Sequence, residues 1–155
     1  MLPDTDYRFI LAGGIKDKAL RIAVEKMVAI HSDRIEWVGP VQGEAKAEFY
    51  ARSDLFILPS KLVDEADPLV LLESFAAGTV ALASNRGCIP DRVMSPDHLL
   101  SMSLVKDVAL LRYVAGQIET DRGAFAEQAQ THAQAMFQGA QIEGEAFLAA
   151  LGVGR

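Results

Sequence analysis

Residues 53–91, SDLFILPSKLVDEADPLVLLESFAAGTVALASNRGCIPD, decide the fold of this chain. The stretch contains two short apolar runs, Leu55–Leu58 and Val80–Ala83, whose unbroken hydrophobicity is typical of strands that are buried on both faces. Between these runs, Pro68–Ala77 is apolar almost all round and predicts a buried helix. That helix carries one carboxylate, Glu73. A charge in such a helix needs a partner, and the nature of the partner is the main question that the sequence raises.

The rest of the chain extends this alternation of strands and helices. Apolar runs predict further strands over Tyr7–Ala12 and Arg34–Val38, and helical spacing predicts helices over Lys16–Ile30 and Gly43–Arg52. Beyond about residue 100 we expect helices alone, over Val105–Ile118, Ala124–Phe137 and Glu143–Leu151. The predicted fold class is therefore α/β, with a Rossmann-like parallel sheet, helices on both faces and C-terminal helices packed on the body. The short connections predict one domain over residues 1–155.

Composition limits the classes of partner. The chain has 155 residues, of which half are hydrophobic and 23% are charged, and its net charge is −6. This negative charge argues against nucleic acid or an anionic membrane as the main partner. No apolar run is long enough to span a bilayer, and the polar N-terminus does not resemble a signal peptide. The single cysteine, Cys88, fits a reducing compartment, so we expect a cytoplasmic location.

The loops that follow the strands form the expected ligand-binding edge. In open α/β sheets, ligands bind beyond the carboxyl ends of the strands. These ends lead here to Gly13-Gly14, Gly39-Pro40, the loop from Pro59 to Asp67, and the segment Ser84–Cys88. In the central helix, Pro68 suits the first helical position and Asp67 suits the N-cap. The backbone N–H groups around Leu69 and Val70 would then favour an anion such as a phosphate.

Glu73 has two interpretations from the residues alone. A carboxylate only accepts hydrogen bonds, so the paired hydroxyls of a ribose would satisfy it while the diphosphate of the nucleotide binds the helix end. Alternatively, a neighbouring backbone N–H or an arginine such as Arg86 or Arg92 would satisfy Glu73 without any ligand. Glu65, taken alone, is typical of a solvated loop residue. The three histidines are scattered and lack the spacing of metal ligands.

Five motifs in this chain resemble those of a known family. FILAGG, RIEWVGPV, FYARSDLFILPS, EADPLVLLESFAAGTVALAS and RGCIPD follow one another in this order. The order is similar to that of the C-terminal, donor-binding domain of GT-B-fold retaining glycosyltransferases of the glycosyl transferases group 1 family. The pair Glu65 and Glu73, with seven residues between them and Gly78 after a run of small residues, matches the signature of that group. The resemblance covers roughly residues 7–95.

The resemblance implies a function and a role for particular residues. The donor would be a nucleotide-diphosphate sugar, whose glycosyl group passes to an acceptor hydroxyl with retention and without a metal or other cofactor. Glu65 would be catalytic and lie near the transferred sugar, and Glu73 would bind the ribose hydroxyls. The other implied substrate-binding residues are Gly13 and Gly14 in the nucleotide cleft, Trp37, Val38 and Gly39 beside the base, Pro68, Leu69 and Val70 at the diphosphate, and Arg86 and Gly87 on the opposite wall.

The same comparison indicates what this chain is expected to lack. Family members carry an Arg and a Lys earlier in this domain that grip the diphosphate, and they have an N-terminal acceptor-binding domain. The expected partners are therefore the nucleotide sugar, a missing acceptor domain or partner chain, and, as a further option, another copy of the chain. The alternative function is a truncated, non-catalytic nucleotide-binding or scaffold module. A general nucleotide-binding α/β domain is the third option, although no acidic cluster follows the first strand as it would in a response regulator.

Overall fold

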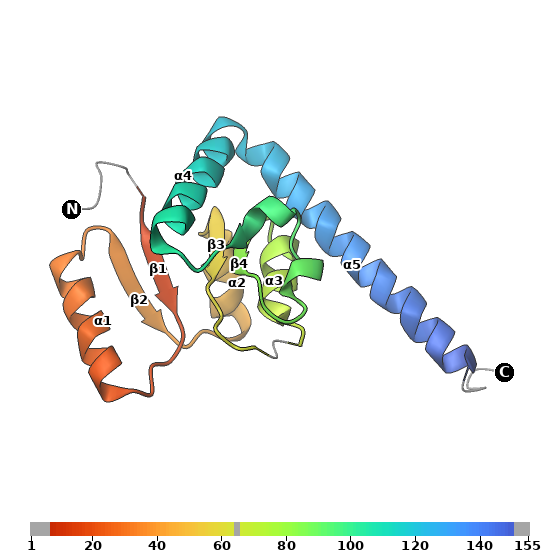
Figure 1. Cartoon of the computed structure of the whole chain (residues 1–155), viewed down its shortest axis with the longest axis horizontal. Helices are drawn as coiled ribbons and strands as arrows, with labels where there is room; N and C mark the ends of the chain where they lie inside the picture. Colours follow the sequence, from red (N-terminus) through yellow and green to blue (C-terminus); the bar gives the residue numbers. More distant parts are fainter. Residues whose placement is uncertain (1–6, 64–65, 151–155) are drawn as a thin grey trace. The chain divides into compact units, whose positions relative to one another are not determined.

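The computed structural model of the chain describes residues 7–63 and 66–150 (Figure 1). Its internal contacts divide the chain into two compact units, residues 1–49 and residues 50–155. Each unit has its own parallel strands, and the division falls within helix α2 (Gly43–Ala51). The predicted α/β class with parallel strands is confirmed. The single domain over residues 1–155 stays a prediction.

The first unit pairs two parallel strands, β1 (Phe9–Ala12) and β2 (Ile35–Gly39). Helix α1 (Lys18–Ile30) connects them. The Asp17 side chain caps this helix by accepting a hydrogen bond from the backbone N–H of Leu20 at 2.7 Å. Such a cap satisfies one of the N–H groups that a helix leaves without an internal partner, and it fixes the start of the helix after the loop of residues 13–17.

The second unit orders three parallel strands as β3–β4–β5, namely Leu55–Leu58, Val80–Ser84 and Leu99–Leu100. Its helices are α3 (Leu69–Ala76), α4 (Leu104–Thr120) and α5 (Arg122–Ala150), and the 3-10 helices η1 (Ile89–Asp91) and η2 (Pro96–His98) lie between β4 and β5. All five residues of β4 are buried, as expected of the central strand of a parallel sheet. The sequence did not predict β5, because two residues are too few to show a periodic pattern.

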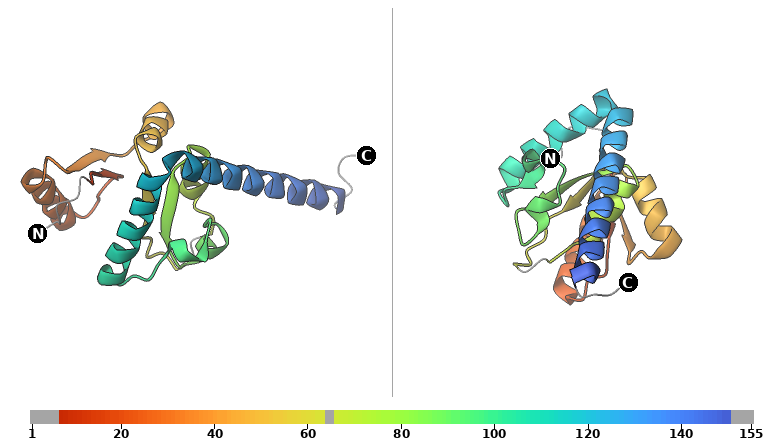
Figure 2. Two further views of the ribbon diagram at one scale, coloured as in Figure 1. Left: turned by 90° about the horizontal axis from the view of Figure 1, so that it is seen from above. Right: turned by 90° about the vertical axis from the view of Figure 1, so that its right-hand side faces the viewer.

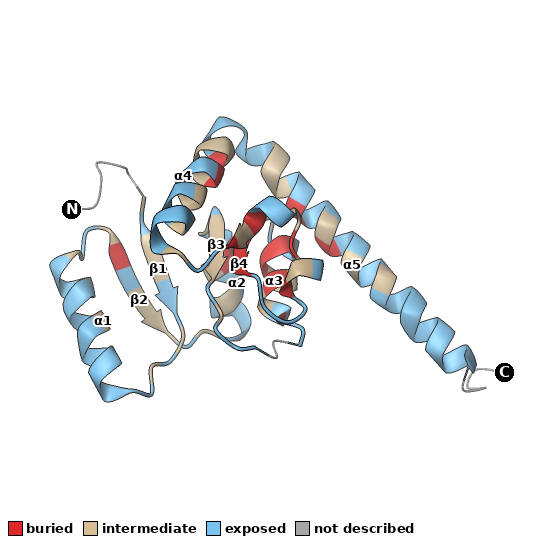
Figure 3. Ribbon diagram, in the orientation of Figure 1, coloured by how far each residue is buried: buried red, intermediate tan, exposed pale blue. Residues whose placement is uncertain are grey.

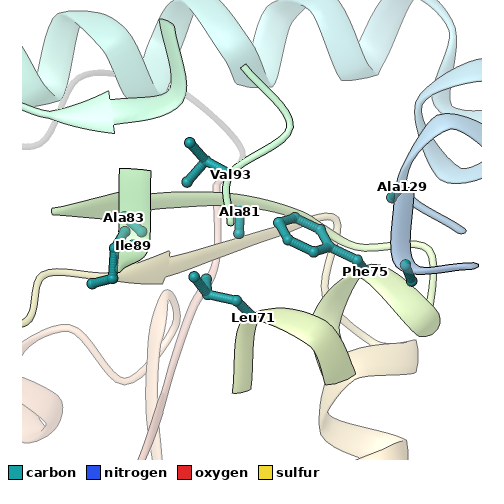
Figure 4. Packing of buried hydrophobic residues seen from close by; sticks show 8 residues of the cluster. Leu71, Phe75, Ala81, Ala83, Ile89, Val93 and Ala129 are labelled. Carbon is teal, nitrogen blue, oxygen red and sulfur yellow. The ribbon is translucent and has the colours of Figure 1, made fainter. Parts of the chain in front are cut away.

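One face of β4 is covered by α3 and α5. Ala81 and Ala83 belong to a fully buried cluster that includes Leu71 and Phe75 of α3 and Ala129 of α5. Figure 4 shows Leu71 and Phe75 extending from α3 toward the strand. Each of these five side chains has no measurable exposure. This cluster explains why the central helix is apolar almost all round.

The other face of β4 is covered by α4. Val80 and Leu82 pack with Val114 and Ile118 of that helix, in a second buried cluster. Successive side chains of a strand point to opposite faces, so one strand contributes to both clusters. The prediction of helices on both faces is thereby confirmed for the second unit.

Helix α5 is a single helix of 29 residues, Arg122–Ala150, in each view (Figure 2). The apolar spacing predicts two helices instead, Ala124–Phe137 and Glu143–Leu151. That prediction is wrong because no proline separates the two segments, and glycine lowers helix stability without ending a helix. Residues 141–150 are all exposed (Figure 3). The predicted packing of the C-terminal helix on the body is confirmed for its first half, where Ala129 and Ala133 are buried, but not for the segment predicted as Glu143–Leu151, where Phe147 has an exposed fraction of 64%.

Helix α3 ends in a Schellman motif that contains Gly78. Gly78 has φ +81°, and its N–H donates to the Phe75 carbonyl at 2.9 Å. The N–H of Thr79 donates to the Ser74 carbonyl at 2.8 Å. A Cβ atom added to Gly78 would lie 3.3 Å from the Cβ atom of Ala126. Both the backbone conformation and the space at this position therefore favour glycine.

The Gly78→Ala substitution is expected to lower the free energy of unfolding by about 1–2 kcal/mol, the typical cost of a left-handed conformation for a residue with a Cβ atom. Urea denaturation followed by circular dichroism measures the change. Gly116→Ala in α4 is the matched control, because an added Cβ there meets nothing within 4 Å. We expect Gly116→Ala to raise stability by up to about 1 kcal/mol through helix propensity. Equal effects of the two substitutions would contradict the prediction.

Candidate functional site

Two glycines and a tryptophan meet at the carboxyl ends of β1 and β2. The N–H of Gly13 donates to the Gly39 carbonyl at 2.7 Å, and the indole Nε1–H of Trp37 donates to the Gly13 carbonyl at 3.0 Å. Gly13 and Gly39 have φ values of +123° and +71°, which glycine adopts at little cost. The guanidinium of Arg21 lies 5.8 Å from the centre of the Trp37 ring. The indole is therefore fixed by contacts within the first unit.

Gly14 and Val38 are the other residues that the resemblance implies in the first unit. A Cβ atom added to Gly14 would lie 3.5 Å from Cγ of Pro40, an ordinary contact, so sterics do not demand glycine there. Val38 is half-buried in β2. The roles of all these residues toward a nucleotide stay predictions. The structure brings Gly13, Trp37 and Gly39 together, and Glu73 belongs to the second unit.

In the second unit, polar contacts hold the loops at the carboxyl ends of β3 and β4. The Ser84 hydroxyl donates to the Ser60 carbonyl at 2.7 Å. Nε of Arg92 lies 3.0 Å from Oδ1 of Asp67, an ion pair without the angle of a hydrogen bond. Nε2 of His132 lies 2.8 Å from the Arg92 carbonyl, so the ring donates there. These contacts join the loop before α3 to β4, to the segment after η1 and to α5.

Helix α3 begins at Leu69, one residue later than predicted. Pro68 is extended, with ψ 94°, and occupies the N-cap position without a side-chain hydrogen bond. The prediction that Pro68 is the first helical residue and Asp67 the cap is therefore wrong, because the Asp67 carboxylate pairs with Arg92 instead. The N–H of Leu71 donates to the Pro68 carbonyl at 2.8 Å, so the two preceding amides form the N-terminal end of the helix.

Glu73 is half-buried on α3, beside the last turn of α2. The Tyr50 hydroxyl lies 3.5 Å from Oε2 of Glu73 and 3.1 Å from the Val70 carbonyl. Burial, together with the negative charge of Glu73, raises the pKa of Tyr50 above its ordinary value, so this hydroxyl stays protonated. Arg92, one of the two arginines considered as a structural partner for Glu73, pairs with Asp67.

Tyr50 is the site residue that the sequence did not reveal. It lies in the FYARSDLFILPS motif, directly after Phe49 at the end of a polar helix, where aromatic residues normally indicate core packing. Its contact with Glu73 joins residues that are 23 positions apart in the sequence. A pattern of local periodicity cannot show such a pair.

Three further residues lie near the turn after β4. Arg86 and Gly87 are exposed there, and Gly87 has φ +49°. The N–H of Ile89 donates to the Arg86 carbonyl at 3.0 Å, which closes the turn. Cys88 is an exposed free thiol in the same turn. Glu65, the expected catalytic residue, lies outside the described residues, so its role stays a prediction.

Within residues 7–63 and 66–150, no three histidine, cysteine, aspartate or glutamate side chains lie close enough together to hold a metal ion. Within the same ranges, no helix combines the length and the apolar composition that crossing a membrane would need.

Comparison with known families gives a match to the profile described as glycosyl transferases group 1, over residues 2–112. The match covers more than half of the chain. This protein belongs to the glycosyl transferases group 1 family. The resemblance stated from the five motifs is thereby confirmed. A search of curated protein sequences found no match to the chain.

Solved structures share the fold of this glycosyltransferase domain. Anabaena Alr3699/HepE in complex with UDP matches with a TM-score of 0.65 and 18% identity, over 84% of this chain and 35% of that chain. Sucrose-phosphate synthase from Thermosynechococcus elongatus gives a TM-score of 0.61 and 21% identity, over 93% of this chain and 46% of that chain. AviGT4, a glycosyltransferase involved in avilamycin A biosynthesis, gives 0.51 and 18%, over 84% and 41%.

These likenesses establish the fold of the domain. The chain spans between 35% and 46% of the length of the three solved proteins.

Proposed function

We propose that this chain is the donor-binding domain of a retaining glycosyltransferase and that its ligand is a nucleotide-diphosphate sugar. Membership of the glycosyl transferases group 1 family supports this proposal, as does the similarity to a protein that was solved in complex with UDP. The observation that carries the proposal is Glu73, a half-buried carboxylate on a helix whose other residues are nearly all apolar. A carboxylate in this environment favours a ligand that brings hydrogen-bond donors.

A nucleotide carries groups that would bind both Glu73 and the start of α3. The ribose hydroxyls would donate to the Glu73 carboxylate. The diphosphate would bind the backbone N–H groups of Leu69 and Val70, where the helix dipole favours an anion. Arg86, exposed in the turn after β4, would add positive charge near the diphosphate. We also propose that Glu65 lies near the transferred sugar and that Gly13, Gly14 and Trp37 contact the nucleoside.

The proposed reaction breaks the bond between the anomeric carbon of the sugar and the diphosphate oxygen. The oxygen of an acceptor hydroxyl bonds to the same carbon with retention, and the hydroxyl proton is released. The leaving diphosphate carries the electron pair of the broken bond, so the groups that stabilise its charge lower the barrier. The helix N-terminus and basic side chains would provide this stabilisation, and the proposal requires no metal ion.

Transfer itself would need an acceptor-binding part from a further domain or a partner chain. This part of the proposal is supported by the extent of the structural matches, which cover less than half of each solved protein. A role in carbohydrate biosynthesis in the cytoplasm belongs to the same proposal. Robust sugar transfer by the purified 155-residue chain would contradict the need for an additional part.

Glu73→Gln is expected to weaken nucleotide binding by about 1–3 kcal/mol, because the neutral amide loses charge-assisted hydrogen bonds from the ribose. A thermal-shift screen with UDP, GDP and ADP first identifies the nucleoside diphosphate that binds best, since ligand binding raises the unfolding temperature. Titration calorimetry with that nucleotide then compares the affinities of the original chain and the variant.

Glu119→Gln is the matched control, because Glu119 lies exposed on α4. We expect this control to leave the affinity unchanged. Equal affinities of the original chain and the Glu73→Gln variant would show that Glu73 does not bind the nucleotide and has only a structural role. Failure of all three nucleotides to bind would remove the basis of the proposed function.

A further inference from the structure

We propose that Tyr50 is a positioning residue for ribose recognition, and that its hydroxyl holds the Glu73 carboxylate in the orientation that accepts a ribose hydroxyl. This inference rests on the proposed function. It adds a residue from outside the segment between the two glutamates of the family signature.

The ring of Tyr50 is held firmly. Its exposed fraction is 4%, and it packs edge-to-face against Phe56 of β3, with 5.6 Å between ring centroids and an angle of 81°. The Tyr50 backbone is also fixed, because the Thr79 hydroxyl lies 3.1 Å from its carbonyl and 3.2 Å from that of Ser53. The N–H of Ser53 donates to the Tyr50 carbonyl at 2.9 Å. These contacts leave the phenol little freedom to move relative to α3.

The hydroxyl of Tyr50 reaches two acceptors that lie about one helical turn apart on α3. The Val70 carbonyl is 3.1 Å away and Oε2 of Glu73 is 3.5 Å away. One O–H group donates to one acceptor at a time, so the two oxygens share the same proton. Because the raised pKa keeps Tyr50 protonated, the hydroxyl is a donor toward Glu73 and does not become a second negative charge beside it.

This contact limits the orientations that the carboxylate can adopt. A glutamate side chain has several rotatable bonds, and fixing them at the moment of binding costs conformational entropy. A donor that already holds one carboxylate oxygen reduces this cost, which is the general effect of preorganisation. A carboxylate accepts several hydrogen bonds, so the contact at Oε2 leaves capacity for the ribose.

A simpler role for Tyr50 predicts different behaviour. If the hydroxyl only satisfies its own hydrogen bonding through Val70, its removal changes the stability of the domain and affects all nucleotides equally. If the hydroxyl acts through Glu73, its removal affects only ligands that donate a ribose hydroxyl to Glu73. The two roles are therefore distinguished by comparing a nucleotide with its 2′,3′-dideoxy analogue, which has neither ribose hydroxyl.

The test uses Tyr50→Phe, which keeps the buried ring and removes the hydroxyl. Calorimetry measures binding of whichever of UDP, GDP and ADP binds best, and of its 2′,3′-dideoxy counterpart. We expect the ribonucleotide to bind about 3- to 10-fold more weakly, a loss that corresponds to the net free energy of one hydrogen bond. The affinity for the dideoxynucleotide is expected to change by less than about twofold. In a Glu73→Gln background, Tyr50→Phe is expected to add nothing further.

Tyr113→Phe is the matched control. Tyr113 is 63% exposed on α4, and its hydroxyl accepts a hydrogen bond from Gln117 at 3.1 Å. The control should leave both affinities unchanged. Equal losses for the two nucleotides in Tyr50→Phe, or no loss for either, would overturn the inference.

A second variant keeps the inference testable if Tyr50→Phe does not fold. Glu73→Asp retains the charge but shortens the side chain, so it withdraws the carboxylate from the Tyr50 hydroxyl. We expect it to reduce the preference for the ribonucleotide, and a full preference in this variant would overturn the inference.

If the unmodified chain shows no preference and Glu73→Gln has no effect, the proposed function has failed. If the chain shows the preference and Glu73→Gln abolishes it but Tyr50→Phe does not, only the role of Tyr50 has failed.

Discussion

Replacing Phe75 with alanine is expected to lower the free energy of unfolding by about 3–5 kcal/mol, the usual range for a buried phenylalanine. Phe75 has no exposed surface and lies in the cluster formed by α3, β4 and α5. Its ring also packs edge-to-face against His132 of α5, with 5.0 Å between centroids and an angle of 85°. Truncation would remove these contacts and leave a cavity that the neighbouring alanines cannot fill. Urea denaturation measures the loss.

Phe147→Ala is the matched control for this substitution. Phe147 lies in the same unit on α5, but its exposed fraction is 64%. We expect its removal to change the free energy of unfolding by less than about 0.5 kcal/mol, as is usual for an exposed position. A loss below about 1 kcal/mol for Phe75→Ala would show that the cluster does not hold α3 and α5 together.

Leu82→Ala is expected to lower the free energy of unfolding by about 2–5 kcal/mol. Leu82 is fully buried on the face of β4 that α4 covers, together with Val114 and Ile118. Far-UV circular dichroism is the appropriate probe. The single tryptophan, Trp37, lies in the first unit and does not report directly on the second.

Leu104→Ala provides the comparison for Leu82→Ala. Leu104 is the first residue of α4 and is 80% exposed. Its replacement should leave the urea midpoint nearly unchanged, because little apolar surface is buried there. Similar midpoints for Leu82→Ala and Leu104→Ala would indicate that α4 is not packed on the sheet.

The strands and helices up to Ser84 could be predicted because their patterns are local. Leu55–Leu58 and Val80–Ala83 are unbroken apolar runs, and the structure has strands at Leu55–Leu58 and Val80–Ser84. The end of α3 could be predicted because a glycine follows a run of small residues. Its start was misplaced by one residue, because a distant side chain, Arg92, takes the carboxylate of Asp67.

The candidate site was less accessible to sequence reasoning. Glu73 stood out because a carboxylate is unusual in an apolar helix, but its neighbour Tyr50 comes from another helix and has no chemical signature of its own. The resemblance pointed to Glu65, which lies outside the described residues. The contact between Tyr50 and Glu73 depends on how two helices pack, and the periodicity of a single sequence does not contain that information.

The alternation of side-chain size along β4 bears on how this sequence can diverge. The strand offers small residues, Ala81 and Ala83, to the face where α3 contributes Leu71 and Phe75. On the opposite face, the strand itself contributes bulk through Leu82 and its neighbour Val80. Cores tolerate substitution when their total volume is conserved.

A larger residue at position 81 or 83 would therefore require a smaller one at position 71 or 75, whereas the α4 face can exchange volume with that helix independently. Two separate volume constraints on either side of one strand let many residue combinations fill the same space. This freedom is consistent with a shared fold at 18–21% identity.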